Sequence, residues 1–333
     1  MTTKPPSHGP AGYAIAADIG GTNIRAAVVS RAGKVMSKGA LPTYPERGIA
    51  DAAERLAALI ETAKSAVSGE RLVGIGVSTA GPVDPSTGVY NHPPNLAGWH
   101  GRTMRPLLGK LTGLNVWVGH DATLAALAET RHGSNKGAQN LIYVTISSGI
   151  GGGIIANGEM VTGATGHAGE MGHITVRPGA QKCNVGCDGC FEGNASGPAI
   201  ARMAAARISS GEKSSLSRAA NGDLSRITGR MVFDAVAAGD ALAKSVIDLT
   251  IDNIGLGLAS LLNVFDPEAM VIGGGVVDGL KPQYARVEES VLRHSLPHYR
   301  DRGAVPLSVT TLGDDVSLIG AAAMTFRRAD TLG

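Results

Sequence analysis

Residues 13–30 read YAIAADIGGTNIRAAVVS, which is an apolar run, a small polar turn and a second apolar run in succession. The pattern predicts a β-hairpin whose turn leaves its backbone N–H groups open to a ligand, because glycine carries no side chain. Residues 141–158, LIYVTISSGIGGGIIANG, repeat the pattern. The two hairpins predict two related α/β halves that face a cleft, each of which contributes a phosphate-binding turn.

Predicted helices and strands alternate along the rest of the chain. Apolar residues recur at helical spacing in three segments, and two further segments are typical of buried strands. The helical segments are 48–67, 121–130 and 240–265, and the strands are 71–78 and 114–119. This alternation is typical of α/β layers with parallel strands. A third glycine run, at 269–279, follows a strand and precedes a helix, whereas residues 211–228 read as a solvated connection.

The composition allows two ordinary domains and excludes several classes of partner. The 333 residues are 43% hydrophobic and 17% charged, with a formal net charge of +2, so no strong field recruits nucleic acid or an anionic membrane. Residues 1–12 are polar and Pro-rich, which predicts a flexible tail and not a signal peptide. No run reaches the roughly 18 apolar residues of a membrane span. We therefore predict a cytoplasmic protein that binds neither nucleic acid nor membranes.

All three cysteines lie in one short segment, KCNVGCDGCFE, at residues 182–192. Three cysteines cannot all pair as disulfides, and a reducing cytoplasm does not favour disulfides. Three thiolates and one imidazole satisfy tetrahedral zinc, which explains the clustering better than scattered buried thiols do. Four protein ligands close such a site, so its zinc is structural. The predicted ligands are His173, Cys183, Cys187 and Cys190.

The two glycine turns are candidate phosphate sites. The alternative for each turn on its own is an ordinary hairpin turn, and the occurrence of two raises the case for both. In the first turn, DIGGTN, Asp18 is placed to hold Mg²⁺ directly or through water. The predicted phosphate-binding residues are Asp18, Gly20, Gly21 and Thr22 in the first turn and Ser148, Gly149 and Gly151 in the second.

The usual nucleotide-binding motifs are missing from the sequence. There is no G-x-x-x-x-G-K-[ST] stretch, which excludes a P-loop. The glycines of residues 149–153 do not match G-x-G-x-x-G, because Ile154 stands at the final glycine position and a strand follows. A Rossmann dehydrogenase is therefore poorly supported.

His120 and Asp121 stand where a predicted strand gives way to a helix. An Asp at this point is an N-cap in the simplest interpretation. The same position lies outside the carboxyl end of a strand, where ligands of α/β proteins bind. There a carboxylate can accept a hydroxyl proton while the hydroxyl oxygen attacks phosphorus. Asp121 is therefore a candidate general base.

Together these features resemble the ROK family of bacterial sugar kinases and sugar-responsive repressors. The resemblance extends from about Tyr13 to Phe326. The motifs that carry it are, in order, DIGGTNIR (18–25), STAGPVD (78–84), PNLAGW (94–99), HDATLAALAE (120–129), SSGIGGG (147–153), GHAGEMGH (166–173), the cysteine segment ending in Glu192, and IGGG (272–275).

The resemblance implies an α/β, actin-like (ribonuclease H-like) two-domain sugar kinase with a central cleft for ATP and sugar. A small domain is expected over residues 13–119 and 315–330, and a large one over 120–314, with the zinc loop at 173–192. ATP with Mg²⁺ is the implied phosphoryl donor, and the zinc is structural. We further expect a homodimer or homotetramer.

The resemblance also implies the residues of a sugar site. Asp121 is the general base for a sugar hydroxyl, usually the 6-hydroxyl, as in a glucokinase. One ring nitrogen of His173 is expected on zinc and the other near a sugar hydroxyl. The implied sugar ligands are Gly81, Asn95, Asp121, Glu170, His173 and Glu192, with His120 beside them, and the adenosine end of ATP is expected near Gly273, Gly274 and Gly275.

Three departures from the family pattern bear on these expectations. Val185 occupies the second cysteine position of the usual C-x-C-G-x-x-G-C-x-E cluster, and Cys187 stands two residues later. The second phosphate turn usually reads G-T-G, and Ser148 keeps the hydroxyl there. His120 replaces the usual Asn beside the base, so it bears directly on which sugar is bound.

Two other function classes remain as alternatives. A DNA-binding repressor of the same family needs a helix-turn-helix domain ahead of the first glycine turn, and only 17 Pro-rich residues precede Asp18. A non-catalytic sugar binder would not need Asp18 and Asp121. The sequence leaves open glucose, mannose, an N-acetylhexosamine, an amino sugar or a cyclitol as substrate, and polyphosphate as a donor.

Overall fold

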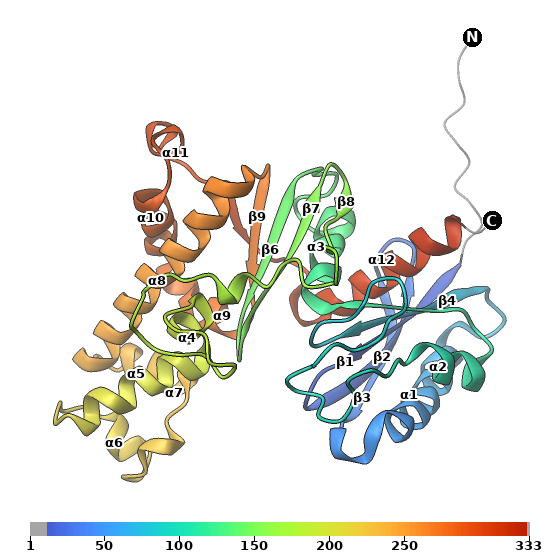
Figure 1. The fold of residues 1–333 in the computed structure, drawn as a ribbon, viewed down its shortest axis with the longest axis horizontal. Helices are drawn as coiled ribbons and strands as arrows, with labels where there is room; N and C mark the ends of the chain where they lie inside the picture. The colour runs from blue at the N-terminus through green and yellow to red at the C-terminus, as the bar shows by residue number, and fades with distance from the viewer. Residues whose placement is uncertain (1–11, 332–333) are drawn as a thin grey trace. The chain divides into compact units, whose positions relative to one another are not determined.

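The computed structural model describes residues 12–331, which form two compact units (Figure 1). The first unit comprises residues up to Gly137, Met160–Ala168, and the residues from Leu312 onward; the second comprises Ala138–Glu159 and Gly169–Thr311. The boundary expected from the sequence, between residues 119 and 120, falls one helix earlier than this division. Of the predicted tail, residues 1–11 lie outside the described residues.

The first unit is built on a five-stranded mixed sheet in the order β3-β2-β1-β4-β5. Its strands are β1 (Tyr13–Ile19), β2 (Asn23–Ser30), β3 (Val35–Pro42), β4 (Leu72–Thr79) and β5 (Val116–His120). β1 and β2 are antiparallel and form the predicted hairpin, whereas β4 runs parallel to both β1 and β5. The predicted strands 71–78 and 114–119 are thereby confirmed within two residues.

Helices cover both faces of this sheet because alternate residues of β1 are apolar on both sides. Ile15 and Ala17 belong to the core that includes residues of α1 (Gly48–Lys64) and α2 (Arg105–Thr112). Ala14 and Ala16 belong to the opposite core, with α3 (Asp121–His132) and α12 (Val316–Asp330). α3 packs against α12 and the sheet, which is why it groups with the first unit.

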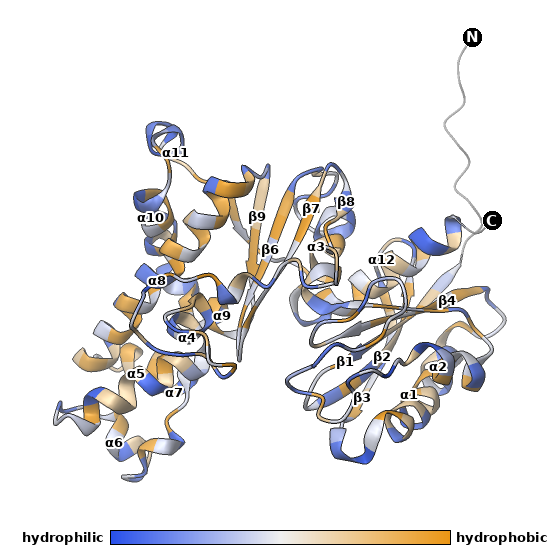
Figure 2. Cartoon of the chain, viewed as in Figure 1, coloured by the Kyte–Doolittle hydropathy of each residue, from blue (hydrophilic) through white to orange (hydrophobic). Residues whose placement is uncertain are grey.

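The second unit has its own five-stranded sheet, in the order β10-β9-β6-β7-β8. The strands are β6 (Leu141–Ile146), β7 (Ile150–Ala156), β8 (Glu159–Met160), β9 (Ala269–Gly273) and β10 (Leu307–Val309). β6 and β7 form the second predicted hairpin, and β9 runs parallel to β6. Figure 2 shows β6 and β9 as largely hydrophobic, as expected for central strands.

The helices of the second unit gather around α8, its longest helix. They are α4 (Phe191–Ala195), α5 (Gly197–Ser209), α6 (Leu216–Ala219), α7 (Gly229–Ala237), α8 (Ala241–Phe265), α9 (Gly275–Leu280), α10 (Tyr284–His294) and α11 (Pro297–Arg302). α8 begins after Asp240, whose side chain accepts a 2.9 Å hydrogen bond from the backbone N–H of Ala243. α4, α7 and α10 all pack against it.

By length and composition, α8 is the one helix among the described residues that could cross a membrane. However, 67% of its most apolar stretch is buried inside the unit, as is typical of a core helix.

The predicted solvated connection at residues 211–228 is confirmed only in part: most of its residues are exposed, but it also contains structure that the sequence did not indicate. This segment contains α6, and Leu216 and Ile227 are both buried, with exposed fractions of 1% and 6%. Polar residues outnumber the few apolar ones in this segment, so the burial of Leu216 and Ile227 could not be predicted from a clear periodic signal.

Gly76 fixes how closely α12 approaches β4. A Cβ at this position would lie 2.1 Å from the carbonyl oxygen of Ala321. We predict that Gly76→Ala lowers the free energy of unfolding by about 1–3 kcal/mol, because backbone would have to move. The matched control is Gly109→Ala in α2, where the nearest atom is 3.7 Å away and the helix favours alanine. Urea unfolding of both variants checks this, and equal midpoints would contradict it.

Candidate active site and metal centre

The β1–β2 turn of the first unit has the backbone arrangement of an anion site. Thr43 fixes the turn through two of its carbonyl groups. Its Oγ1 donates to the carbonyl of Gly20 at 2.6 Å, and its N–H donates to the carbonyl of Thr22 at 2.8 Å. Within the described part of the chain, the N–H groups of Gly21 and Thr22 have no hydrogen-bond acceptor. Two N–H donors are thus open to phosphate oxygens.

Asp18, at the end of β1, is held by two neighbours. Arg25 donates to its Oδ2 from Nε at 3.0 Å and from Nη2 at 2.7 Å, and the hydroxyl of Ser78 donates to Oδ1 at 2.8 Å. These bonds fix the carboxylate, which is 15% exposed. Because both oxygens already accept hydrogen bonds, contact with Mg²⁺ through a water fits this arrangement better than direct ligation.

Three parallel strands bring the predicted first-unit residues to one sheet edge. The pairing register places Asp18 beside Ser78 and Ser78 beside Gly119, while Thr79 lies beside His120. α3 therefore begins at the carboxyl edge of the sheet, next to the strand that ends in the first glycine turn. This is the edge at which α/β proteins bind their ligands.

Asp121 is the first residue of α3, and His120 is its N-cap residue. The side chain of Asp121 is 39% exposed and that of His120 is 14% exposed. His120 Nε2 lies 3.2 Å from Asp121 Oδ1, which also accepts a 2.6 Å hydrogen bond from the N–H of Ala122. The N-cap interpretation therefore does not describe Asp121, whose carboxylate stays accessible at the helix start.

The loop that carries Asn95 is fixed to the same unit by buried aromatic residues. Tyr90 and Trp99 are fully buried and stack edge to face with centroids 5.4 Å apart. Gly81 adopts φ +96°, and a Cβ there would lie 2.9 Å from Pro93. A Cβ on Gly21 would lie 2.8 Å from that of Asn95. The structure thus brings two predicted sugar ligands of this unit, Gly81 and Asn95, close to the first phosphate turn.

The β6–β7 turn of the second unit repeats the pattern of the first. Ser147 N–H donates to the carbonyl of Gly149 at 2.8 Å and closes the turn. The N–H groups of Ser148 and Gly149 have no acceptor among residues 12–331. The next N–H, from Ile150, donates to Glu192 Oε2 at 2.9 Å. The predicted sugar ligand Glu192 therefore lies directly beside the second phosphate turn.

A pocket of about 890 Å³ opens beside this turn, entirely within the second unit. Ser147 and Ser148 line it together with Gly275, at the start of α9. Gly274 adopts φ +98°, and a Cβ there would lie 2.6 Å from the carbonyl of Ile146. The pocket therefore joins the second turn to Gly275, the last residue of the predicted adenosine site at 273–275.

Sequence reasoning missed the other side of this pocket. Its lining there comes from the start of α5 and from the segment that enters α7. These residues are Gly197, Pro198, Ala201, Arg202, Ser225, Ile227, Thr228, Gly229, Arg230 and Phe233. No motif marks them, because they come together only through the close approach of two helix starts: a Cβ on Gly229 would lie 3.0 Å from the carbonyl of Gly197.

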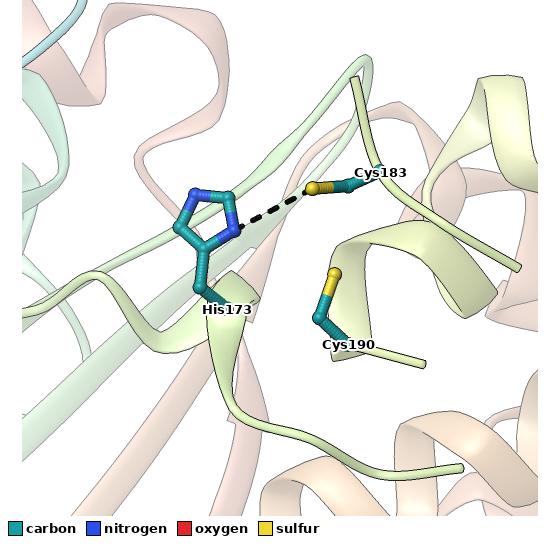
Figure 3. A group of neighbouring side chains, drawn as sticks. All are labelled: His173, Cys183 and Cys190. Carbon is teal, nitrogen blue, oxygen red and sulfur yellow. Dashed lines mark hydrogen bonds between the residues drawn. The ribbon is translucent and has the colours of Figure 1, made fainter. Parts of the chain in front are cut away.

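Three of the four predicted metal ligands converge in the second unit (Figure 3). The donor atoms of His173, Cys183 and Cys190 all lie within 4.8 Å of one another, and His173 Nδ1 is 3.8 Å from Cys183 Sγ. The edges of a zinc tetrahedron with these ligands measure roughly 3.5–3.8 Å, given Zn–S and Zn–N bonds near 2.3 and 2.0 Å. This donor set therefore fits zinc.

Cys187 lies outside the converging group but interacts with the thiol of Cys183. Burial raises the pKa of Cys187, and Cys183 adds to the rise; burial also raises the pKa of Cys190, to about 11. Burial raises the pKa of Cys183 too, but hydrogen bonds from the N–H groups of Val185 and Cys187 and from the thiols of Cys190 and Cys187 together lower it below its usual value. Cys183 is therefore the thiol most ready to bind a metal.

The two ring nitrogens of His173 face different groups. Nδ1 faces Cys183, while Nε2 lies 3.7 Å from Glu170 Oε2. The short helix Met171–His173 carries this imidazole, which contacts Cys183 on one side and Glu170 on the other. A metal on Nδ1 would thus leave Nε2 and the carboxylate of Glu170 available to a ligand.

These features can be compared with known proteins. The model of the ROK family matches residues 14–328, which is nearly the whole chain. The chain belongs to the ROK family. A glucokinase of Halalkalibacterium halodurans is 35% identical over 317 residues, covering 92% of each chain.

Solved structures of ROK proteins share the fold. A ROK family glucokinase from Streptomyces griseus, in complex with glucose and AMPPNP, is 31% identical and matches with a TM-score of 0.80, over 95% of this chain and 100% of that one. This confirms the predicted actin-like, two-domain α/β fold. A DNA-binding transcriptional dual regulator of Escherichia coli is 30% identical over 256 residues, but the match covers only 61% of its length.

We predict that the purified ROK protein carries one zinc ion per chain, on His173, Cys183, Cys190 and Cys187. Elemental analysis checks this. The thiols must lose their protons to bind zinc, so zinc should dissociate as the pH is lowered. Cys190→Ser should lose the metal and lower stability. Metal-free protein from a preparation without chelators would contradict the prediction.

Proposed function

We propose that this chain is an ATP-dependent hexose kinase, glucokinase-like, that phosphorylates the 6-hydroxyl of its sugar with Asp121 as general base. The observation that carries the proposal is the shared sheet edge of the first unit, where an accessible carboxylate follows β5 and an open glycine turn follows β1. Both parts are needed for phosphoryl transfer to a hydroxyl. The glucokinase relatives support the same activity.

The nucleotide is proposed to bind through the two glycine turns and the pocket of the second unit. The pocket volume of about 890 Å³ is ample for an adenosine moiety. The predicted adenosine residues are Gly273, Gly274 and Gly275, of which Gly275 lines the pocket. The open N–H groups of both turns would bind phosphate oxygens, and Asp18 would hold the hydrated Mg²⁺.

The sugar is proposed to bind through groups of both units. The first unit would supply Gly81, Asn95, His120 and Asp121, and the second would supply Glu170, His173 and Glu192. Carboxylates and amides suit the paired donor and acceptor character of sugar hydroxyls. The proposal requires that these groups act on one sugar molecule while the reaction proceeds.

Most of the catalytic effect would come from positioning and from neutralising charge. Asp121 would accept the hydroxyl proton at a carboxylate oxygen as that hydroxyl attacks the γ-phosphorus. Glu192 accepts a hydrogen bond from the N–H of Ile150. This bond would hold the sugar-binding carboxylate next to the turn that binds the phosphates. The zinc would supply structural cross-linking of the loop.

The location and assembly of the enzyme follow the family expectation. We propose a cytoplasmic homodimer or homotetramer with a small-molecule sugar as its partner.

The role of Asp121 is tested by Asp121→Asn. The amide keeps the shape but cannot take a proton at neutral pH, so turnover should fall at least ~100-fold while ATP binding is retained. Coupled ADP release and nucleotide titration measure the two quantities. Near wild-type turnover would show that another group is the base.

The role of His120 is tested by His120→Asn. His120 is 14% exposed and lies beside the proposed base, where the family carries Asn. An imidazole is bulkier than an amide and offers different hydrogen bonds, so we expect the wild type to prefer a sugar that differs from glucose near O3 or O4. The variant should shift the ranking of kcat/KM among hexoses toward glucose. An unchanged ranking would assign His120 to packing at the strand end.

A further inference from the structure

Arg177, which precedes the cysteines on the chain, connects their segment to α8 by hydrogen bonds. Its Nε donates to Asn253 Oδ1 at 2.9 Å, and its Nη2 donates to Asp252 Oδ2 at 3.1 Å. The guanidinium thus contacts two neighbouring residues of the core helix with two separate donors. Lysine cannot reproduce this planar arrangement.

Backbone hydrogen bonds join the two ends of the same segment. The N–H groups of Val176 and Arg177 both donate to the carbonyl of Gly189 at 3.0 Å. Gly189 adopts φ +62°, and a Cβ there would lie 2.0 Å from the carbonyl oxygen of Arg177. The two ends of the loop 177–189, which we call the metal loop, are therefore held together, and Arg177 connects them to the core.

Asn253 extends the connection to α4. It is fully buried, and its Nδ2 donates to the carbonyl of Asn194 at 3.0 Å. Asn194 in turn donates from Nδ2 to the carbonyl of Cys190 at 2.8 Å. Glu192 lies between these two residues on the chain. The hydrogen bonds of Asn253 and Asn194 therefore connect the core helix to the short helix that carries Glu192.

Asp252 also has partners on α10, so the contact between α8 and α10 does not depend on Arg177. Besides Arg177, it faces His294 Nε2 at 3.1 Å and Arg293 at 3.7 Å, both from α10. Removing the guanidinium of Arg177 leaves these contacts between α8 and α10 in place. The consequence should thus be confined to the metal loop and α4.

We propose that Arg177 and Asn253 are positioning residues for sugar binding: they fix the metal loop and α4 to α8 and so orient Glu192. This rests on the function proposed above for Glu192. Neither residue is a proposed sugar or nucleotide ligand. They act through the 2.9 Å hydrogen bond from Ile150 to Glu192. The geometry of this bond depends on the position of α4, which carries Glu192.

The test compares Arg177→Gln with a matched control, Arg286→Gln. Arg286 Nη2 contacts Asp248 at 2.8 Å, one helical turn earlier on α8. The exposed side-chain fractions are alike, 44% and 34% for the control pair against 40% and 31% for Arg177 and Asp252. The control removes an equivalent ion pair without touching the metal loop.

We expect Arg177→Gln to raise the sugar KM about tenfold with the ATP KM unchanged, as the loss of a charged hydrogen bond predicts. Hydrogen–deuterium exchange should quicken in residues 178–195, and zinc content should stay that of the wild type. Arg286→Gln should change none of these. Arg177→Lys should restore part of the sugar affinity, and Asn253→Asp, which loses the donor to Asn194, should reproduce the effect of Arg177→Gln.

An unchanged sugar KM with unchanged exchange in Arg177→Gln would overturn the proposal, as would an equal rise in the sugar KM of Arg286→Gln. A failure of the proposed function would look different, because wild-type protein would then phosphorylate no hexose. The exchange measurement needs no activity, so it would still decide whether Arg177 fixes the metal loop.

Discussion

The hydrogen bond from the backbone N–H of Ile150 to Glu192 Oε2 connects the candidate phosphate turn of the second unit to the helix that follows the cysteine segment. On one side of it lies a glycine turn with open N–H donors; on the other lies α4, which begins directly after Cys190. In the proposed function the cysteine cluster would matter to catalysis through this bond, because whatever fixes α4 also fixes the carboxylate of Glu192. The Arg177 contact with α8 is the proposed means of fixing it, and a metal on the predicted ligands would be a second.

The first unit depends on a comparable constraint, the register of three parallel strands. Pairing of Asp18 with Ser78 and of Ser78 with Gly119 places the first glycine turn and the start of α3 at one edge. Glycines allow the loop that carries Asn95 to approach this edge closely: Gly21 leaves room for Asn95, and Gly81 leaves room for Pro93. Bulkier residues at either position would separate the phosphate turn from the residues proposed to hold the sugar.

Local patterns predicted much of this, and long-range packing could not be predicted. Both hairpins, the start of α3 at Asp121 and the run at 273–275 follow from apolar periodicity and glycine turns in the sequence. The opposite side of the pocket could not be predicted, because Gly197 and Gly229 meet only when α5 and α7 pack. The same holds for Arg177 and Asn253, whose contact spans 76 residues. Three of the four predicted metal ligands converge, while Cys187 lies outside the converging group.

The central claim is that these groups transfer a phosphoryl group from ATP to the 6-hydroxyl of a hexose. The most direct measurement is ADP release over a panel of hexoses, followed by ³¹P and ¹³C NMR of the product. The account predicts ADP formation that depends on the sugar, with a hexose 6-phosphate as the product. Binding of ATP without sugar-dependent ADP release for any hexose, or phosphate on another oxygen, would contradict it.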